Sequence, residues 1–347
     1  MIRFLFRKLM YGSLVLFGVV VLVFFLFQGF GDPARLVLGQ TGDSATIQNI
    51  RKELALDQPV WKQFLFYIND VSPIAIHTQS EIEQKQLKGF FIGGSTKLAI
   101  KLPYLRRSYQ TKKQVGALLS EALPGTLLLA LAAMVFATIA GIFLGVIAAI
   151  KQYSWIDTSA IFASVLGISA PSFFMGIVFA YVFGFLFSNI TGLQMTGGLF
   201  TMDPFTGKAL ALKNLILPAI TLGIRPLAII TQLTRSAMLD VLKQDYIRTA
   251  YAKGLSKRTV VWRHALRNAL NPVITAITGW FAELLAGAFF IEYIFGWKGI
   301  GKVTVDALEK LDFPVVMGSV LVTALFFVLV NILADMLYRM VDPRVSL

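Results

Sequence analysis

The sequence contains no cysteine, only two histidines and few charged residues for its length. Without cysteine, the chain has no disulfides, thiolate metal sites or cysteine nucleophiles. His77 and His264 are too few for a histidine-rich metal centre. Charged residues make up 15% of the 347 residues and hydrophobic residues 56%, whereas soluble domains carry about 25% charged residues. We therefore interpret the chain as a multi-spanning membrane protein.

The sequence also gives no support for a nucleic-acid-binding protein, an ATPase or a metalloenzyme. No soluble basic domain is available for nucleic-acid binding, although the net charge is +13. The phosphate-binding pattern G-x-x-x-x-G-K-S/T does not occur, so we do not expect the chain itself to hydrolyse ATP. Its carboxylates are scattered and form no metal-ligand cluster. We predict no enzyme activity, no cofactor and no metal site within this chain.

Six apolar stretches are long enough to cross a bilayer. The first, 12–30, follows three basic residues and continues without a small-residue cleavage site, so we predict an uncleaved span. Five more stretches follow at approximately 125–150, 159–187, 216–238, 273–295 and 315–340. Six spans would place both termini on the same side of the membrane.

Loop charges predict the orientation. The loop 239–272 is strongly basic, and the C-terminus adds Arg339 and Arg344. The positive-inside rule therefore predicts that both termini are cytoplasmic. The segment 32–115 then lies outside; it carries twelve lysines and arginines, which the rule tolerates in loops longer than about 60 residues. Within it, 47–56 and 60–68 have the pattern of short amphipathic helices.

The predicted fold is an all-α membrane protein with six transmembrane helices and a large extracytoplasmic loop between the first two. The parts are a tail and first helix at 1–31, the extracytoplasmic region at 32–115, a five-helix membrane domain at 116–340 and a cytoplasmic tail at 341–347.

The cytoplasmic segment 244–272, QDYIRTAYAKGLSKRTVVWRHALRNALNP, is the most informative. It divides into two short helices: Asp245 can cap the first, Gly254 suits the left-handed position that ends it, and Ser256 can cap the second. Pro272 would close the segment. Two helices joined by glycine make a compact knob that could fit a groove on a soluble partner. By spacing alone, a solvated basic loop is an equal alternative.

This segment resembles the EAA loop of ABC importer permeases, whose pattern is Glu-Ala-Ala, three residues, Gly, nine residues and Ile-x-Leu-Pro. The residues at these positions are Arg248-Thr249-Ala250, Gly254 and His264-Ala265-Leu266-Arg267. Ala250, Gly254 and Leu266 match this general pattern. The fuller form DYIRTAxAKGLSxxxVxxxHALRNALxPV is typical of the peptide/nickel subfamily.

The resemblance extends over most of the chain. Further similar stretches are GDPAR after the first span, LALDQP at 54–59, PSFF at 171–174, Glu292 followed by FGWKGIG at 295–301, DFPVV at 312–316 and DPRV at 342–345. Lys298 replaces a proline of the subfamily pattern, and about 71–105 is longer than in the usual member.

The resemblance implies a type I ABC importer permease with several partners. These would be a second homologous permease, two ATPase subunits that bind ATP and magnesium, an extracytoplasmic substrate-binding protein and membrane lipid. The helix from Asp245 to Lys253 would be the coupling helix, pushed when the ATPase dimer closes so that the permeases rock. The implied coupling residues are Asp245, Arg248, Thr249, Ala250, Lys253, Gly254, Leu255, His264 and Leu266.

Three ionisable residues within the predicted spans are candidate functional residues. Arg225 directly precedes Pro226, and Glu283 lies at a similar depth in the next span. Such residues normally face protein or water. They would either form an ion pair or line a pathway and meet the charged ends of a peptide. Glu292 lies near the outer end of the fifth span.

The sequence favours a permease for di- or oligopeptides in the bacterial inner membrane. A nickel or other small-solute importer of the same family remains an alternative, because selectivity lies largely with the binding protein. A channel that works without ATP is the alternative from another class; it would give the segment 245–267 no partner.

Overall fold

The computed structural model describes residues 2–29, 51, 56–203 and 207–341. The chain divides into two compact units, one of residues 1–123 with 303–325 and the other of residues 124–302 with 326–347. The division runs through two long helices, α6 (Val115–Ile150) and α16 (Phe313–Val341).

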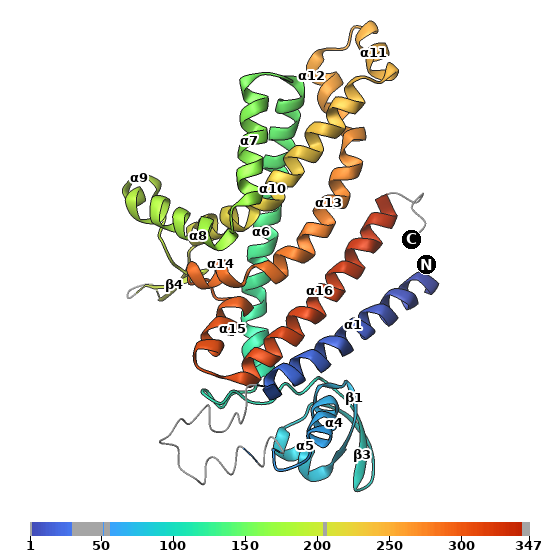
Figure 1. The fold of residues 1–347 in the computed structure, drawn as a ribbon, viewed down its shortest axis with the longest axis vertical. Coiled ribbons are helices and arrows are strands. Elements are labelled where there is room, and N and C mark those ends of the chain that lie inside the picture. The colour runs from blue at the N-terminus through green and yellow to red at the C-terminus, as the bar shows by residue number, and fades with distance from the viewer. Residues whose placement is uncertain (1, 30–50, 52–55, 204–206, 342–347) are drawn as a thin grey trace. The chain divides into compact units, whose positions relative to one another are not determined.

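The first unit begins with α1 (Ile2–Gly29), the predicted first span (Figure 1). Its helix α4 (Val60–Val71) confirms the amphipathic helix predicted at 60–68. The helix predicted at 47–56 lies mostly outside the described residues. Phe24 of α1, Tyr67 of α4 and Leu321 of α16 are buried together and form the apolar core of this unit.

The region predicted to be extracytoplasmic also contains a sheet, so the all-α prediction is wrong for residues 74–101. Its strands are β1 (Ile74–Thr78), β2 (Gly89–Gly93) and β3 (Thr96–Lys101), antiparallel in the order β1-β3-β2, with α5 (Gln79–Lys85) between β1 and β2. The register places six exposed apolar side chains on one face: Ile74, Ile76, Phe90, Ile92, Leu98 and Ile100. The opposite face buries small and polar side chains: Ala75, His77, Ala99 and Lys101.

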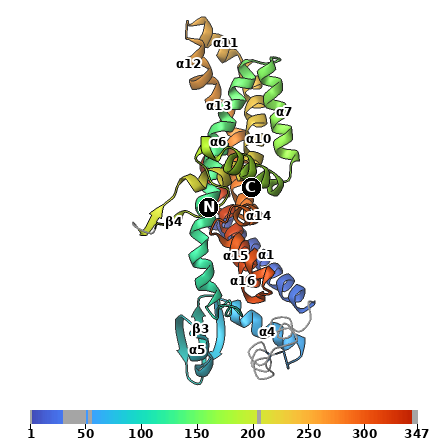
Figure 2. The same cartoon turned by 90° about the vertical axis from the view of Figure 1, so that its left-hand side faces the viewer.

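The second unit is a helical bundle with a short hairpin. Its elements after α6 are α7 (Trp155–Ser169), α8 (Ser172–Tyr181), η2 (Val182–Leu186), α9 (Ser188–Thr191), β4 (Phe200–Asp203), β5 (Gly207–Leu210), α10 (Lys213–Leu242), α11 (Asp245–Ala252), α12 (Lys257–Thr259), η3 (Val260–Ala265), α13 (Leu266–Gly287), α14 (Phe289–Ile294) and the start of α15 (Ile300–Glu309). Figure 2 shows α7, α10 and α13 running alongside α6, with α11 and α12 at one end.

Four helices of the described residues are long and apolar enough to cross a membrane, namely α1, α6, α10 and α16. The stretch predicted as a third span is instead broken: α7 and the α8–η2 helix meet at 110°, because Ala170 and Pro171 are extended. Counted as one span, this bent pair would be a fifth. The stretch predicted at 273–295 ends early at Gly287 and continues as the short helix α14.

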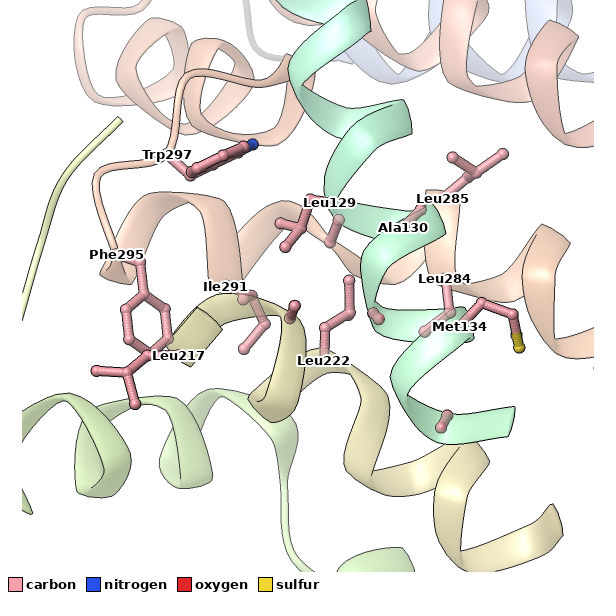
Figure 3. Packing of buried hydrophobic residues seen from close by; sticks show 14 of the residues in the cluster. Leu129, Ala130, Met134, Leu217, Leu222, Leu284, Leu285, Ile291, Phe295 and Trp297 are labelled. Carbon is pink, nitrogen blue, oxygen red and sulfur yellow. The ribbon is translucent and has the colours of Figure 1, made fainter. Parts of the chain in front are cut away.

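The core of the second unit joins α6, α10, α13 and α14. Figure 3 shows Leu129 and Met134 on α6 close to Leu222, Leu284 and Ile291 from the neighbouring helices. Glycines bring α6 and α10 into close contact: a Cβ atom on Gly145 would lie 2.6 Å from the Cβ of Thr234. Small residues at such an interface let two backbones approach, which stabilises helix pairs in a membrane.

Candidate functional site

The basic segment 244–272 folds into the predicted pair of helices around glycine. Gly254 has φ +77° and follows α11, as the sequence predicts. The hydroxyl of Ser256 accepts a hydrogen bond from the Thr259 amide at 3.3 Å and caps α12. In Figure 1, α11 and α12 lie together at one end of α10 and α13.

Two predictions about the ends of this segment are wrong. The residue before α11 is Gln244, which makes no side-chain cap, and Asp245 is already helical. Pro272 lies inside α13 and does not close the segment. Ala269 and Val273, on either side of Pro272, are fully buried, so packing offsets the hydrogen bond that proline removes from a helix.

One side of α11 anchors it to the bundle. Ile247 and Ala250 are buried in an apolar cluster with Val146 of α6 and Met238 of α10. Val260, Val261 and Ala265 of η3 belong to the same cluster. Movement of α11 would therefore be passed directly to the ends of α6 and α10. Ala250, predicted as a coupling residue, serves here as an anchor and does not face outward.

The other side of α11 is exposed and both basic and aromatic. The exposed predicted residues are Asp245, Arg248, Thr249, Lys253, Gly254 and Leu255. The Arg248 side chain is 78% exposed, with Nη1 3.6 Å from the Asp245 carboxylate. Tyr246 and Tyr251 are exposed beside it and were missed by the sequence analysis. Tyrosine and arginine are enriched at protein interfaces, so this surface suits a protein partner.

The last two predicted coupling residues lie farther from this surface. His264 is half-buried within η3, and Leu266 begins α13 and packs against the same apolar cluster. Tyr246 connects α11 to α13, because the side-chain amide of Asn268 in α13 donates a hydrogen bond to the Tyr246 hydroxyl at 2.7 Å. The segment is thus one packed unit with a free outer face.

A partly buried ion pair links the start of α7 to α10. The Arg235 guanidinium donates to both carboxylate oxygens of Asp157, from Nε at 2.5 Å and from Nη2 at 2.8 Å. The Asp157 side chain is 4% exposed and also accepts from the Tyr153 amide at 3.0 Å. Two parallel hydrogen bonds fix orientation as well as distance. The pair therefore holds the α6–α7 turn against α10, one helical turn before Met238.

Glu292 is fully buried at the start of the FGWKGIG stretch. Its Oε2 accepts hydrogen bonds from the amides of Gly301 at 2.7 Å and Lys302 at 3.2 Å, in the first turn of α15. A carboxylate at a helix N-terminus satisfies free amides and is favoured by the helix dipole. Gly299 is needed for this arrangement, because a Cβ there would lie 2.3 Å from the carboxylate.

Trp297 fixes the same stretch to α6. Its side chain is 1% exposed, and the indole N–H donates to the Gly125 carbonyl at 2.9 Å. The amide of Ile300 donates to the Thr126 hydroxyl at 2.8 Å. The residues that resemble the subfamily pattern here thus hold one structure together within the second unit.

Comparison with known proteins identifies the family of the chain. The family described as the binding-protein-dependent transport system inner membrane component matches residues 141–347, and its N-terminal family matches residues 1–130. The di/tripeptide transport system permease protein DppB of Pseudomonas aeruginosa is 37% identical over 99% of both chains. The glutathione transport system permease protein GsiC of Escherichia coli is 34% identical over 99% of both.

The chain belongs to this transport family. It is therefore a multi-pass inner-membrane component of a binding-protein-dependent transport system. Among solved structures, the inward-facing methionine ABC transporter MetNI matches 65% of this chain and 97% of its own, at 15% identity and a TM-score of 0.49.

In this permease component, the predicted intramembrane charges do not form one group. Arg225 and Glu283 are both exposed, and no ion pair joins them among the described residues. The Arg225 guanidinium instead lies over the Trp280 ring, 5.9 Å from its centroid. Exposure of both charges favours the pathway or an interface over a pair within this chain. Glu292 fits neither alternative, since it caps α15.

Proposed function

We propose that this chain is the permease subunit of an ATP-driven ABC importer for di- or oligopeptides. It would form half of a translocation pathway, together with a second homologous permease. Two ATPase subunits would bind ATP and magnesium on the cytoplasmic side, and a binding protein would deliver the substrate outside.

The coupling segment is the observation that carries this proposal. Its anchored inner side and exposed basic and aromatic outer side are what a lever between a soluble motor and a helix bundle requires. Closure of the ATPase dimer would push α11, and the cluster around Ile247 would pass the movement to α6 and α10. A channel without an ATPase would have no use for this surface.

The proposed topology has six crossings and cytoplasmic termini. The bent helices α7 and α8–η2 would count as one crossing, and α13 with α14 as another. The basic loop around α11 supports a cytoplasmic position for that end of the bundle. The region with β1, β2 and β3 would then be extracytoplasmic.

The peptide substrate is inferred from relatives and from two exposed charges. The names of the two curated relatives state di/tripeptides and glutathione, and both align along nearly the whole chain. A peptide in zwitterionic form offers a carboxylate to Arg225 and an ammonium to Glu283. Nickel is the alternative substrate.

The test is uptake by purified complexes in proteoliposomes. The chain would be produced with the ATPase, second permease and binding protein encoded beside it, and uptake of a labelled dipeptide measured with and without ATP. We expect ATP-dependent uptake that excess unlabelled dipeptide abolishes and nickel does not. Uptake of nickel alone would favour the alternative substrate, and uptake without ATPase subunits would support a channel.

A further inference from the structure

The helix α4 of the first unit carries its apolar side chains on one continuous arc. At 100° per residue, the arc covers about 140° of the helix. Its members are Val60, Trp61, Phe64, Leu65, Ile68 and Val71. Lys62, Asn69 and Asp70 lie on the opposite side, where Phe66 is the one apolar exception.

Among the described residues, protein covers only the part of this arc that carries Phe64 and Val71. These two side chains pack against the core formed by Phe24, Tyr67 and Leu321, and the rings of Phe24 and Phe64 are 5.1 Å apart. The other margin is exposed: Trp61 is 61% exposed and Leu65 is 54% exposed. We call Trp61 and Leu65, with the half-buried Ile68 beside them, the bare stripe; the three lie at positions i, i+4 and i+7 of one helix face.

The bare stripe continues the apolar surface of a membrane-crossing helix. Phe25 near the end of α1 is 53% exposed, and its ring lies 5.7 Å from that of Phe64. Leu22 and Leu26 on α1 are also more than half exposed. An apolar surface therefore runs from α1 through Phe64 to the bare stripe without a polar break.

The chemistry of the stripe suits the boundary between lipid headgroups and acyl chains. Lys62 extends over the Trp61 ring, with Nζ 5.6 Å from the ring centroid. Tryptophan prefers this boundary, because its ring is apolar and its N–H is polar, and lysine can reach from it toward the headgroups.

The polar side of α4 is already used by the rest of the unit. The Asn69 side chain donates to the Ile76 carbonyl at 2.7 Å and accepts from the Ile76 amide at 3.0 Å. Lys85 donates to the Asp70 carboxylate at 2.5 Å. These bonds fix the rotation of α4, so the bare stripe cannot turn inward.

We propose that α4 is an interfacial helix whose bare stripe lies in the lipid surface at the outer end of α1. The occupant is the bilayer and not another protein, because the stripe is continuous with the surface of a span. The helix then holds the three-stranded sheet on its side away from lipid. The proposal rests on the proposed function in one respect only, namely the orientation of the chain, which decides in which leaflet α4 lies.

Spin labels test this directly, since the chain has no native cysteine. Leu65→Cys and, as the control on an exposed side chain of α5 in the same unit, Gln84→Cys would be labelled in the assembled transporter in liposomes. Collisions with oxygen, which concentrates in lipid, and with a water-soluble nickel chelate would be compared. We expect the ratio of oxygen to chelate accessibility to be several-fold higher at position 65 than at position 84.

Two results would overturn the proposal. Equal access of the chelate to both positions would place the stripe in water, and occlusion of position 65 from both reagents would show that protein covers it. If Leu65→Cys fails to assemble, Trp61→Cys on the same stripe replaces it with the same expectation. The measurement does not use transport, so a wrong substrate or an absent ATPase would leave its outcome unchanged.

Discussion

Gly299 is the residue on which the buried cap of α15 depends most closely. A methyl group there would lie 2.3 Å from the Glu292 carboxylate, which would have to move and lose its bonds to the amides of Gly301 and Lys302. We expect Gly299→Ala to cost about 1–3 kcal/mol, as overpacking of a dense core does. Thermal unfolding of the purified transporter measures this loss.

Gly116→Ala is the matched control for that change. Gly116 lies in α6, and a methyl group there would meet nothing within 4 Å. Alanine at an open helical position is neutral or stabilises by up to about 1 kcal/mol. Equal unfolding temperatures for the two variants would mean that the Glu292 cap does not depend on glycine.

We expect His77 to make the stability of the region with β1, β2 and β3 depend on pH. Burial, with Lys101 and Lys85 nearby, lowers the pKa of His77 below its usual value, against the opposite effect of Glu81 and Asp70. In the unfolded chain the His77 side chain therefore binds a proton near pH 6.5, whereas in the folded region it binds one only at a lower pH. Stability is full above about pH 6.5 and falls as the pH drops through the lowered pKa of the folded state.

Hydrogen exchange tests that dependence, after correction for the intrinsic effect of pH. Amide protection in residues 74–101 should fall between about pH 7 and pH 5 in the native sequence. In His77→Gln the protection should stay level over the same range, because glutamine does not titrate. A parallel decline in both proteins would assign the effect to another group.

At the scale of elements, the Asp157–Arg235 ion pair joins α7 to α10. Replacing Arg235 by methionine would leave a carboxylate that is 4% exposed without its cation. Because the Arg235 side chain is 21% exposed, the cost should stay below the value of about 3–5 kcal/mol for breaking a fully buried ion pair. We expect Arg235→Met to lower the unfolding temperature of the permease.

The control is Arg248→Met, which breaks the exposed pair of Arg248 with Asp245, and both variants are measured in the permease purified without ATPase subunits. Exposed pairs contribute little to stability, so this variant should unfold like the native sequence. If Arg235→Met also unfolded like the native sequence, α7 would be held to α10 by apolar packing alone.

The elements differ in how well the sequence predicts them. Long apolar runs such as α1, α6 and α10 are predictable, because a bilayer-length stretch has few alternatives. The sheet of β1, β2 and β3 was missed because its strands alternate apolar side chains with Ala75, His77 and Lys101 over only five or six residues. Short alternating stretches are weak signals, and here the apolar face is the exposed one.

In segment 244–272, the local turn and cap could be predicted from the sequence, whereas the packing contacts could not. Gly254 and Ser256 have local roles in turn and cap, which the sequence predicts and the structure confirms. The inward position of Ala250 and the role of Ile247 depend on contacts with α6 and α10, which no local pattern contains. The capping role of Glu292 was missed for the same reason, because its hydrogen-bond partners follow nine and ten residues later, across a turn.

At the scale of the whole molecule, the central claim is that the outer face of α11 binds an ATPase subunit. Arg248 is the most informative position, since its side chain is 78% exposed and contributes to no core. Reversing its charge should weaken the contact with the partner without unfolding the permease. Lys88→Glu is the matched control, because Lys88 is an exposed lysine of the first unit, outside segment 244–272.

The most direct measurement is co-purification of ATPase subunits with the tagged permease, together with the rate of ATP hydrolysis by the isolated complex. The account predicts that ATPase subunits purify with the native sequence and with Lys88→Glu, and that Arg248→Glu loses most of the bound ATPase or its stimulated hydrolysis. Full retention of both by Arg248→Glu, or no ATPase with the native sequence in any mild detergent, would contradict it.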